Sequence, residues 1–304
     1  MYNNLKRILA VVSAIVVSGL AAQAEGTAKG RRCEIVFSGY EGTETLKDFP
    51  ALIKIPDGLA GFDYAEAAEN GQDIAFYGED GRPLEREIDT WNPEGDSYIW
   101  VRVPELKKGT RIKAEWGKTK RKGQTEGGGQ DVWNEDYLAV WHFSKFRDYV
   151  TLDAKNGLAA EVRGKDRRKF IHADAFVGKG YYAAAAHPTE WGTYLNVPDD
   201  PRWTAYSKTG RLTVSFMVNS TIKKESEIKL NHARILSNKR DYGDELGFEV
   251  AIAGGDRIWS CGQGRSNFWF DTKEYSGNDA RAFRNGWAYV TVTFDGRRRE
   301  SNFW

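Results

Sequence analysis

The sequence is poor in cysteine and methionine, with two of each among 304 residues. Two cysteines cannot supply the several bridges that hold together a small disulfide scaffold. Cys33 and Cys261 lie near opposite ends of the chain, without a Cys-x-x-Cys motif or Cys-His clustering, so a zinc site is not indicated. An oxidising compartment would permit a bridge between them, and two free thiols are the alternative.

An excess of charge of one sign is also lacking, since 44 Lys and Arg residues balance 43 Asp and Glu residues. This balance argues against nucleic acid as a partner, because a polyanion-binding protein carries a strongly basic surface. No apolar run after residue 24 approaches the ~20 residues that cross a bilayer. We therefore expect no transmembrane segment in the mature chain.

The N-terminal segment has the order of a secretory signal. Lys6 and Arg7 precede an apolar run from Ile8 to Leu20, and Ala22-Gln23-Ala24 then offers a small-x-small cleavage site. The sequence predicts a signal peptide over 1–24 and an exported protein that is periplasmic, at the cell surface or extracellular. An uncleaved anchor is the alternative.

The sequence is rich in aromatic residues and glycine, and in several stretches its apolar and polar residues alternate. It contains 11 Trp and 32 Gly, and 13% of its residues are aromatic. Apolar residues occupy every second position over 98–103, 212–218 and 288–294, which is typical of half-buried strands. Long helical periodicity is missing, and 64–70 is expected to make a turn or two. The predicted class is all-β.

A polar, glycine-rich segment over 118–131 has no apolar periodicity and is expected to be a linker. It divides the mature chain into residues 25–117 and 132–304. Strand patterns on both sides, and no alternation of strands with helices, predict two β-sandwich domains in series.

Several stretches of the first part occur in the order of a known family. They are 40–50, 61–64, 70–76, 83–91, 99–106 and 109–117. With these motifs, residues 33–117 resemble the domain of unknown function 2341, which occurs in exported and envelope proteins. No reaction is attached to that family. It also occurs fused to transport proteins that resemble proton channels.

The second part resembles a laminin-G-like, concanavalin A-like jelly roll. The likeness rests on 210–218, 235–237 and 287–296. Residues 132–143, which lead into it, resemble the segment that usually follows the domain of the first family. In the jelly-roll family further strands follow the turn at 294–296, so the jelly roll over 132–304 is expected to lack its last strands and to be incomplete at the C-terminus. The strand at 287–294 is then expected at or near a sheet edge.

Glu87-Ile88-Asp89 is the one string that looks catalytic. Jelly-roll β-glucan hydrolases carry three carboxylates at alternate strand positions, and a pair of them acts as nucleophile and acid/base. Here the third position falls on Trp91 or Asn92. We expect an exposed strand face carrying acids and no catalytic residues. The histidines, each expected to be structural or solvent-facing, are His142, His172, His187 and His232.

The jelly-roll resemblance implies that calcium is possible, because such domains often hold it with Asp, Asn and backbone oxygens. The loop residues that could contribute are Asp153, Asn156, Asp199 and Asp200. Solvated turn residues are the other interpretation, since Asp and Asn favour turns. No other cofactor or metal is expected.

Aromatic residues outside clear core alternation are candidates for a sugar platform, in which a flat ring packs on a sugar between polar groups. They are Trp191, Tyr194, Trp203, Tyr206 and Trp269. The leading hypothesis is a non-catalytic exported or envelope module that binds a glycan or an envelope protein. A secreted glycoside hydrolase or lyase, and an accessory protein of an envelope transport complex, are the alternatives.

Overall fold

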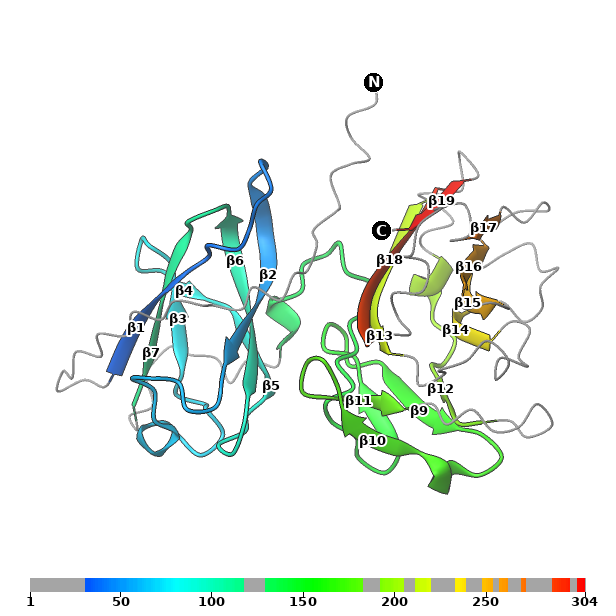
Figure 1. Cartoon of the computed structure of the whole chain (residues 1–304), viewed down its shortest axis with the longest axis horizontal. Helices are drawn as coiled ribbons and strands as arrows, with labels where there is room; N and C mark the ends of the chain where they lie inside the picture. Colours follow the sequence, from blue (N-terminus) through cyan, green and yellow to red (C-terminus); the bar gives the residue numbers. More distant parts are fainter. Residues whose placement is uncertain are drawn as a thin grey trace. The chain divides into compact units, whose positions relative to one another are not determined.

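The structure, a computed structural model, describes residues 31–117, 129–182, 192–204, 211–219, 233–238, 248–253, 257–261, 269–271, 286–295 and 300–303. The expected signal peptide over 1–24 lies outside these residues. The chain, whose strands are labelled in Figure 1, divides into two compact units. Unit 1 comprises Met1–Ala184 with Thr193–Val197, and unit 2 comprises Ala185–Gly192 with Pro198–Trp304.

The division between these units differs from the boundary at 118–131 that composition suggests. Residues 118–128 of that segment lie outside the described residues, whereas 129–182 belong to unit 1. The physical reason is that side chains following residue 129 pack against the first sandwich, as shown below.

The first part of unit 1 is a β-sandwich, as predicted. One antiparallel sheet has the strand order β1-β7-β3-β4 and the other has the order β2-β6-β5. A single buried core contains side chains from both sheets. The strands are β1 (Arg31–Val36), β2 (Leu46–Ile55), β3 (Ala75–Tyr77), β4 (Pro83–Leu84), β5 (Arg86–Thr90), β6 (Ser97–Leu106) and β7 (Arg111–Trp116).

Strand β6 shows how the alternation of side chains along a strand determines which residues reach the later site. Ile99, Val101 and Val103 are fully buried in the core. Each such burial stabilises the fold by roughly 1.5–3 kcal/mol. Trp100 and Arg102 alternate with them and therefore lie on the opposite face of the β2-β6-β5 sheet. That outer face receives the segment after residue 129.

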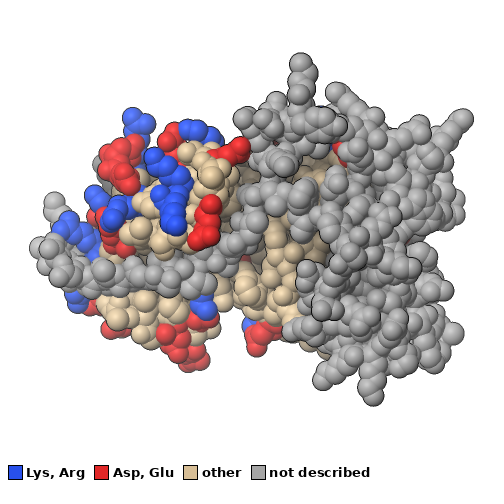
Figure 2. All heavy atoms as spheres, turned by 45° about the horizontal axis from the view of Figure 1, so that its top comes forward, with Lys and Arg blue, Asp and Glu red and all other residues tan. Residues whose placement is uncertain are grey.

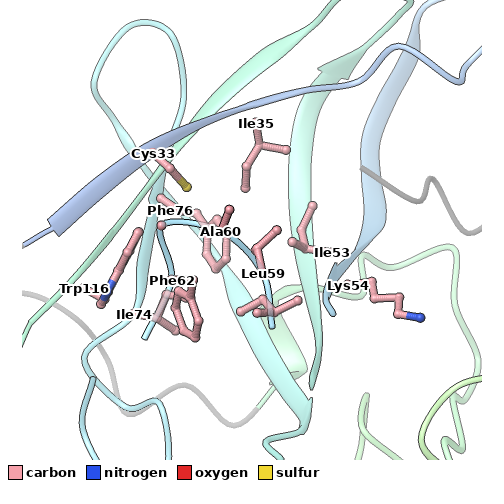
Figure 3. Close-up of a pocket in the computed structure, with 13 residues that line it drawn as sticks. Cys33, Ile35, Ile53, Lys54, Leu59, Ala60, Phe62, Ile74, Phe76 and Trp116 are labelled. Carbon is pink, nitrogen blue, oxygen red and sulfur yellow. The ribbon is translucent and has the colours of Figure 1, made fainter. Parts of the chain in front are cut away.

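The sandwich core encloses a small cavity of about 20 Å³ beside Cys33 (Figure 3). Its lining is almost wholly apolar, which disfavours a bound water even though the volume suffices for one. Cys33 is a free thiol, and burial raises its pKa to about 11. The bridge that the sequence permits is therefore not formed at Cys33 in this structure. The side chains that line the pocket with Cys33 include Ile35, Ile53, Leu59, Phe62, Ile74, Phe76 and Trp116.

Unit 1 continues into a three-stranded antiparallel sheet and a hairpin. The sheet has the order β12-β9-β8, and the hairpin pairs β10 with β11. The strands are β8 (Val150–Leu152), β9 (Ala159–Arg163), β10 (Ile171–Asp174), β11 (Lys179–Tyr182) and β12 (Tyr194–Asn196).

Unit 2 contains two further antiparallel sheets, with the orders β13-β18-β19 and β14-β15-β16-β17. Its buried core includes Phe248 and Val250 beside Val292 and Phe294. The strands are β13 (Arg211–Asn219), β14 (Ala233–Ser237), β15 (Glu249–Ala253), β16 (Arg257–Cys261), β17 (Trp269–Asp271), β18 (Trp287–Asp295) and β19 (Glu300–Phe303).

The neighbours of β18 bear on one expectation. The sequence places this strand at or near an edge; β18 pairs with β13 along its whole length, and its last four residues, Val292–Asp295, also pair with β19 on the other side. The reason is that the residues after the turn form a strand of their own and return antiparallel to β18. Thr293, for example, pairs with Thr213 and with Asn302.

The described residues confirm the all-β class. Their helical elements are 3₁₀ turns: Tyr64–Glu66, Gly129–Asp131, Arg167–Lys169 and Pro201–Thr204. The first is the turn predicted over 64–70, and Asp63 caps it by accepting from the Ala65 N–H. Within the described part of the chain, no helix is long and apolar enough to span a bilayer.

Candidate functional site

Glu87 and Asp89 lie on the outer face of β5, and the structure corrects their predicted exposure. Glu87 stands opposite Trp100 in the register with β6, and the register shifts between Ile88 and Thr90. Only 14% of the Glu87 side chain and 1% of the Asp89 side chain are exposed. They are covered because the outer face of this sheet is packed by later residues and does not face solvent.

The cover is the segment that follows the 3₁₀ turn Gly129–Asp131. Arg102 donates from Nη1 to the Asp131 carbonyl at 3.2 Å, and Lys145 Nζ donates to the Ile88 carbonyl at 3.4 Å. Between these two hydrogen bonds, Trp133 Nε1 donates to Glu87 Oε2 at 2.8 Å. The segment therefore lies across β5 and β6 as a layer fixed by hydrogen bonds.

His142 sits between the two carboxylates. Its Nε2 is 3.2 Å from Glu87 Oε2, and its Nδ1 is 3.8 Å from Asp89 Oδ2. The imidazole stacks on Trp100, with ring centroids 5.4 Å apart, and Trp133 lies 5.6 Å away at a tilt. We refer to Glu87, Asp89, Trp100, Trp133 and His142 as the His142 cluster.

The electrostatics of the cluster favour an ion pair. Burial by itself raises the pKa of Glu87, but the hydrogen bonds and charge that it meets at His142 and Trp133 outweigh burial and leave that pKa lowered. Burial by itself lowers the pKa of His142, but its hydrogen bond to Glu87 and the charge of Asp89 leave that pKa raised. Both shifts favour the charged forms, a cationic imidazole between carboxylates.

This arrangement is chemically suited to holding two layers together. A glycosidase needs a general acid whose pKa is raised and which reaches the substrate, whereas the pKa of Glu87 is lowered and its carboxylate is covered. Asp89 Oδ2 accepts from Trp100 Nε1 at 3.4 Å, and its Oδ1 has no hydrogen-bond partner in the described part of the chain. The cluster is a buried polar contact between the sheet and its cover.

Tyr194 is the one predicted platform residue whose side chain the structure describes. It lies on β12 and is 51% exposed. Trp203 lies in the 3₁₀ turn Pro201–Thr204 and Trp269 begins β17, both described through the backbone only. Trp191 and Tyr206 lie outside the described residues.

Polar residues surround Tyr194 on one face of the β12-β9-β8 sheet. Tyr194 stands directly opposite Arg163, and Asn196 stands opposite Glu161. Antiparallel partners share a face, so the four side chains project together. Leu195 and Val162 alternate with them, and Val162 is fully buried on the other side. We call Tyr194, Asn196, Glu161 and Arg163 the Tyr194 face.

Hydrogen bonds and ring contacts position this face. Glu161 binds Arg163 Nη2 at 2.7 Å through one oxygen and Arg167 Nη1 at 3.1 Å through the other. The Arg167 guanidinium lies 5.1 Å from the centroid of the Tyr149 ring. The residue before Tyr194, Thr193, accepts from the Tyr181 hydroxyl at 2.9 Å. These contacts fix the residue before Tyr194 and the cations beside the platform ring.

Two of the calcium candidates, Asp153 and Asn156, belong to unit 1. Asp153 is buried, and its two carboxylate oxygens accept four backbone N–H bonds from residues 140, 155, 156 and 158. Such a carboxylate has no lone pair left for a cation, so it does not fit calcium. Asn156 Nδ2 donates to the Leu138 carbonyl.

The other two calcium candidates belong to unit 2. Asp200 is bound by Arg202, which lowers its pKa to about 2, and Asp199 is exposed. Searched across the described residues, no three His, Cys, Asp or Glu side chains gather as a metal site.

Comparison with known proteins identifies one family. Residues 70–155 match the family described as Domain of unknown function (DUF2341). The match begins later than the resemblance over 33–117 and extends past the glycine-rich segment, so it contains the whole His142 cluster. Tyr194 lies outside it. No curated protein and no solved structure matches the chain.

Sequence reasoning missed the His142 cluster. It treated His142 as one of four histidines, each expected to be structural or solvent-facing. The sequence did contain a signal, because Glu87 and Asp89 project from the same face of their strand. Two acids on one face require either a cation or solvent. Nothing local indicated that the cation is 55 residues away.

Proposed function

We propose that the chain is a non-catalytic exported or cell-envelope module that binds a glycan at the Tyr194 face. The observation that carries the proposal is the half-exposed Tyr194 ring beside fixed polar side chains on an open sheet face. A sugar ring has one apolar face of C–H groups, and an exposed aromatic ring buries that face. Arg163 and Asn196 then offer donors to the hydroxyls around it.

The non-catalytic part of the proposal is supported by the His142 cluster. Its carboxylates are the acids that a jelly-roll hydrolase would use, and they are engaged by His142, Trp100 and Trp133. The lowered pKa of Glu87 leaves the group ionised and unable to protonate a leaving group at neutral pH.

Export is supported by the order of charge, apolar run and small residues over 1–24. The assignment of residues 132–304 as a laminin-G-like, concanavalin A-like domain is also part of the proposal. It is supported by two antiparallel sheets that contribute to one core, with Phe248 and Phe294 in ring contact 5.5 Å apart. Fold likeness alone does not define the ligand.

The test is a binding screen of purified residues 25–304 against a panel of soluble polysaccharides. For a glycan that binds, Tyr194→Ala is expected to weaken binding about tenfold or more, because it removes the stacking surface. Tyr182→Ala is the matched control, since Tyr182 is an exposed tyrosine of the same unit on β11.

Three results would contradict the proposal. One is the absence of binding to any glycan. Another is equal binding by Tyr194→Ala and the parent protein. The third is cleavage of the bound polysaccharide by the parent protein, which would restore the hydrolase alternative.

A further inference from the structure

The stretch beside the Tyr194 face carries a local excess of positive charge. Over the described face shown in Figure 2, basic and acidic side chains are interspersed, and the whole chain has a net charge of +1. Residues 161–169, by contrast, contain five Lys or Arg and two acids. The stretch includes the last residues of β9 and the 3₁₀ turn Arg167–Lys169. Charge of one sign therefore concentrates next to the platform ring.

The ion pairs in this stretch leave that excess in place. Glu161 is shared by Arg163 and Arg167, so one carboxylate faces two guanidinium groups. A guanidinium carries five N–H donors, and a carboxylate has about four acceptor sites. Glu161 therefore cannot satisfy both arginines, each of which is about half exposed at 51% and 48%. Donors remain for a ligand.

The donors are also placed at the platform. Arg163 is the register partner of Tyr194, and directly opposite residues in a sheet have Cβ atoms ~5 Å apart. A sugar stacked on the Tyr194 ring would have its substituents beside the Arg163 guanidinium. The planar fork of arginine matches carboxylate and similar oxyanions in a bidentate manner.

From this geometry we infer that the ligand of the Tyr194 face is an acidic polysaccharide, whose sugars carry carboxylate or sulfate groups. This inference rests on the proposed function and adds the substrate class. Tyr194 supplies the stacking surface, and Arg163 and Arg167 bind the anionic substituent. Glu161 holds the two arginines in place and competes with the ligand for their donors.

The first experiment compares polysaccharides that differ in charge alone. Binding of residues 25–304 is measured by isothermal titration calorimetry with polygalacturonate and with its methyl ester. The same measurement with dextran sulfate and dextran separates sulfate from carboxylate recognition. We expect an acidic member to bind about tenfold or more tightly than its neutral partner, because hydrogen bonds to charged groups are the stronger kind. The preference should fall as salt is added.

The second experiment uses three substitutions in the same stretch. Arg163→Gln is expected to reduce binding of the acidic polysaccharide about tenfold or more and to weaken binding of its neutral partner much less, because glutamine loses the charge but can still donate to a hydroxyl. Glu161→Gln is expected to strengthen acidic binding, since it removes the competing carboxylate. Arg168→Gln is the control, because Arg168 is 86% exposed and pairs with Asp166 within the 3₁₀ turn. Thermal melts verify that each variant is folded.

The outcomes separate this inference from the proposed function. If neutral and acidic members bind equally and Tyr194→Ala abolishes both, the glycan site stands and the acidic preference is wrong. If the acidic member binds but neither Tyr194→Ala nor Arg163→Gln weakens it, both the site and the inference are wrong. Binding of single-stranded DNA as tight as that of the acidic polysaccharide would also overturn the inference, because it would show that the protein attracts polyanions non-specifically.

Discussion

His142 Nε2 lies 3.2 Å from Glu87 Oε2 across a separation of 55 residues. This contact joins the sheet of the first sandwich to the segment that covers it. Because both residues are largely buried, their charges stabilise unit 1 only while both are present. Breaking one partner of such a buried pair typically costs about 3–5 kcal/mol, since the other charge is left uncompensated.

The first prediction concerns pH. The stability that protonated His142 contributes is complete below its ordinary pKa of 6.5 and is lost as pH rises through its raised, folded-state pKa. The stability that ionised Glu87 contributes is complete above its ordinary pKa of 4.5 and is lost as pH falls through its lowered, folded-state pKa. The contribution of the pair to the free energy of unfolding should therefore be largest between these two values.

Urea unfolding followed by tryptophan fluorescence at a series of pH values measures this, since Trp100 and Trp133 belong to the cluster. His142→Gln should remove the loss of stability that sets in as pH rises above 6.5. His172→Gln should retain it, because His172 is exposed and its Nε2 lies 2.9 Å from the Phe143 backbone carbonyl, which carries no charge. An unchanged pH profile in His142→Gln would show that another group is responsible.

The second prediction concerns Gly129, which approaches Glu87 closely. A Cβ at this position would lie 2.3 Å from Glu87 Cδ. Gly129→Ala must therefore displace the carboxylate from Trp133 and His142, and we expect a loss of about 1–3 kcal/mol in the free energy of unfolding. In the background of Glu87→Ala the same substitution should cost much less, because the obstructing side chain is gone. Equal costs in both backgrounds would contradict the proposed clash.

The third prediction concerns the thiol of Cys33. Burial raises its pKa to about 11, so very little thiolate is present at neutral pH. In a Cys261→Ser background, a thiol reagent such as dithionitrobenzoate should label Cys33 slowly in the native protein and rapidly in denaturant. Native labelling as fast as denatured labelling would mean that the thiol is accessible. In the parent protein, intact-mass analysis without reductant should find no bridge.

The fourth prediction concerns processing. Expressed with its leader in a bacterium, the protein is expected in the exported fraction with Glu25 as its first residue, because Ala22-Gln23-Ala24 precedes that position. Edman sequencing of the exported form measures this directly. Replacing Ala24 with a bulky residue should block cleavage. Full-length parent protein in the membrane fraction would instead indicate an uncleaved anchor.

The spacing of apolar residues predicted those strands in which side chains alternate between the core and the outside. The alternation over 98–103, 212–218 and 288–294 predicted strands, and the structure has β6, β13 and β18 there. The class of the fold follows from the same signal, because a period of two places one side chain in the core and the next outside it. Tyr194 could likewise be named from sequence, since it stands outside that alternation.

The tertiary structure alone decided which outward faces stay open. Glu87 and Asp89 have the sequence pattern of an exposed acidic face, yet residues 129–145 cover them and supply His142 as their cation. Tyr194 and Arg163, in contrast, remain exposed on their sheet. The sequence by itself determined the strands, the side on which each residue projects and the all-β class. It could not determine which sides are covered, because that depends on contacts between segments far apart in the chain.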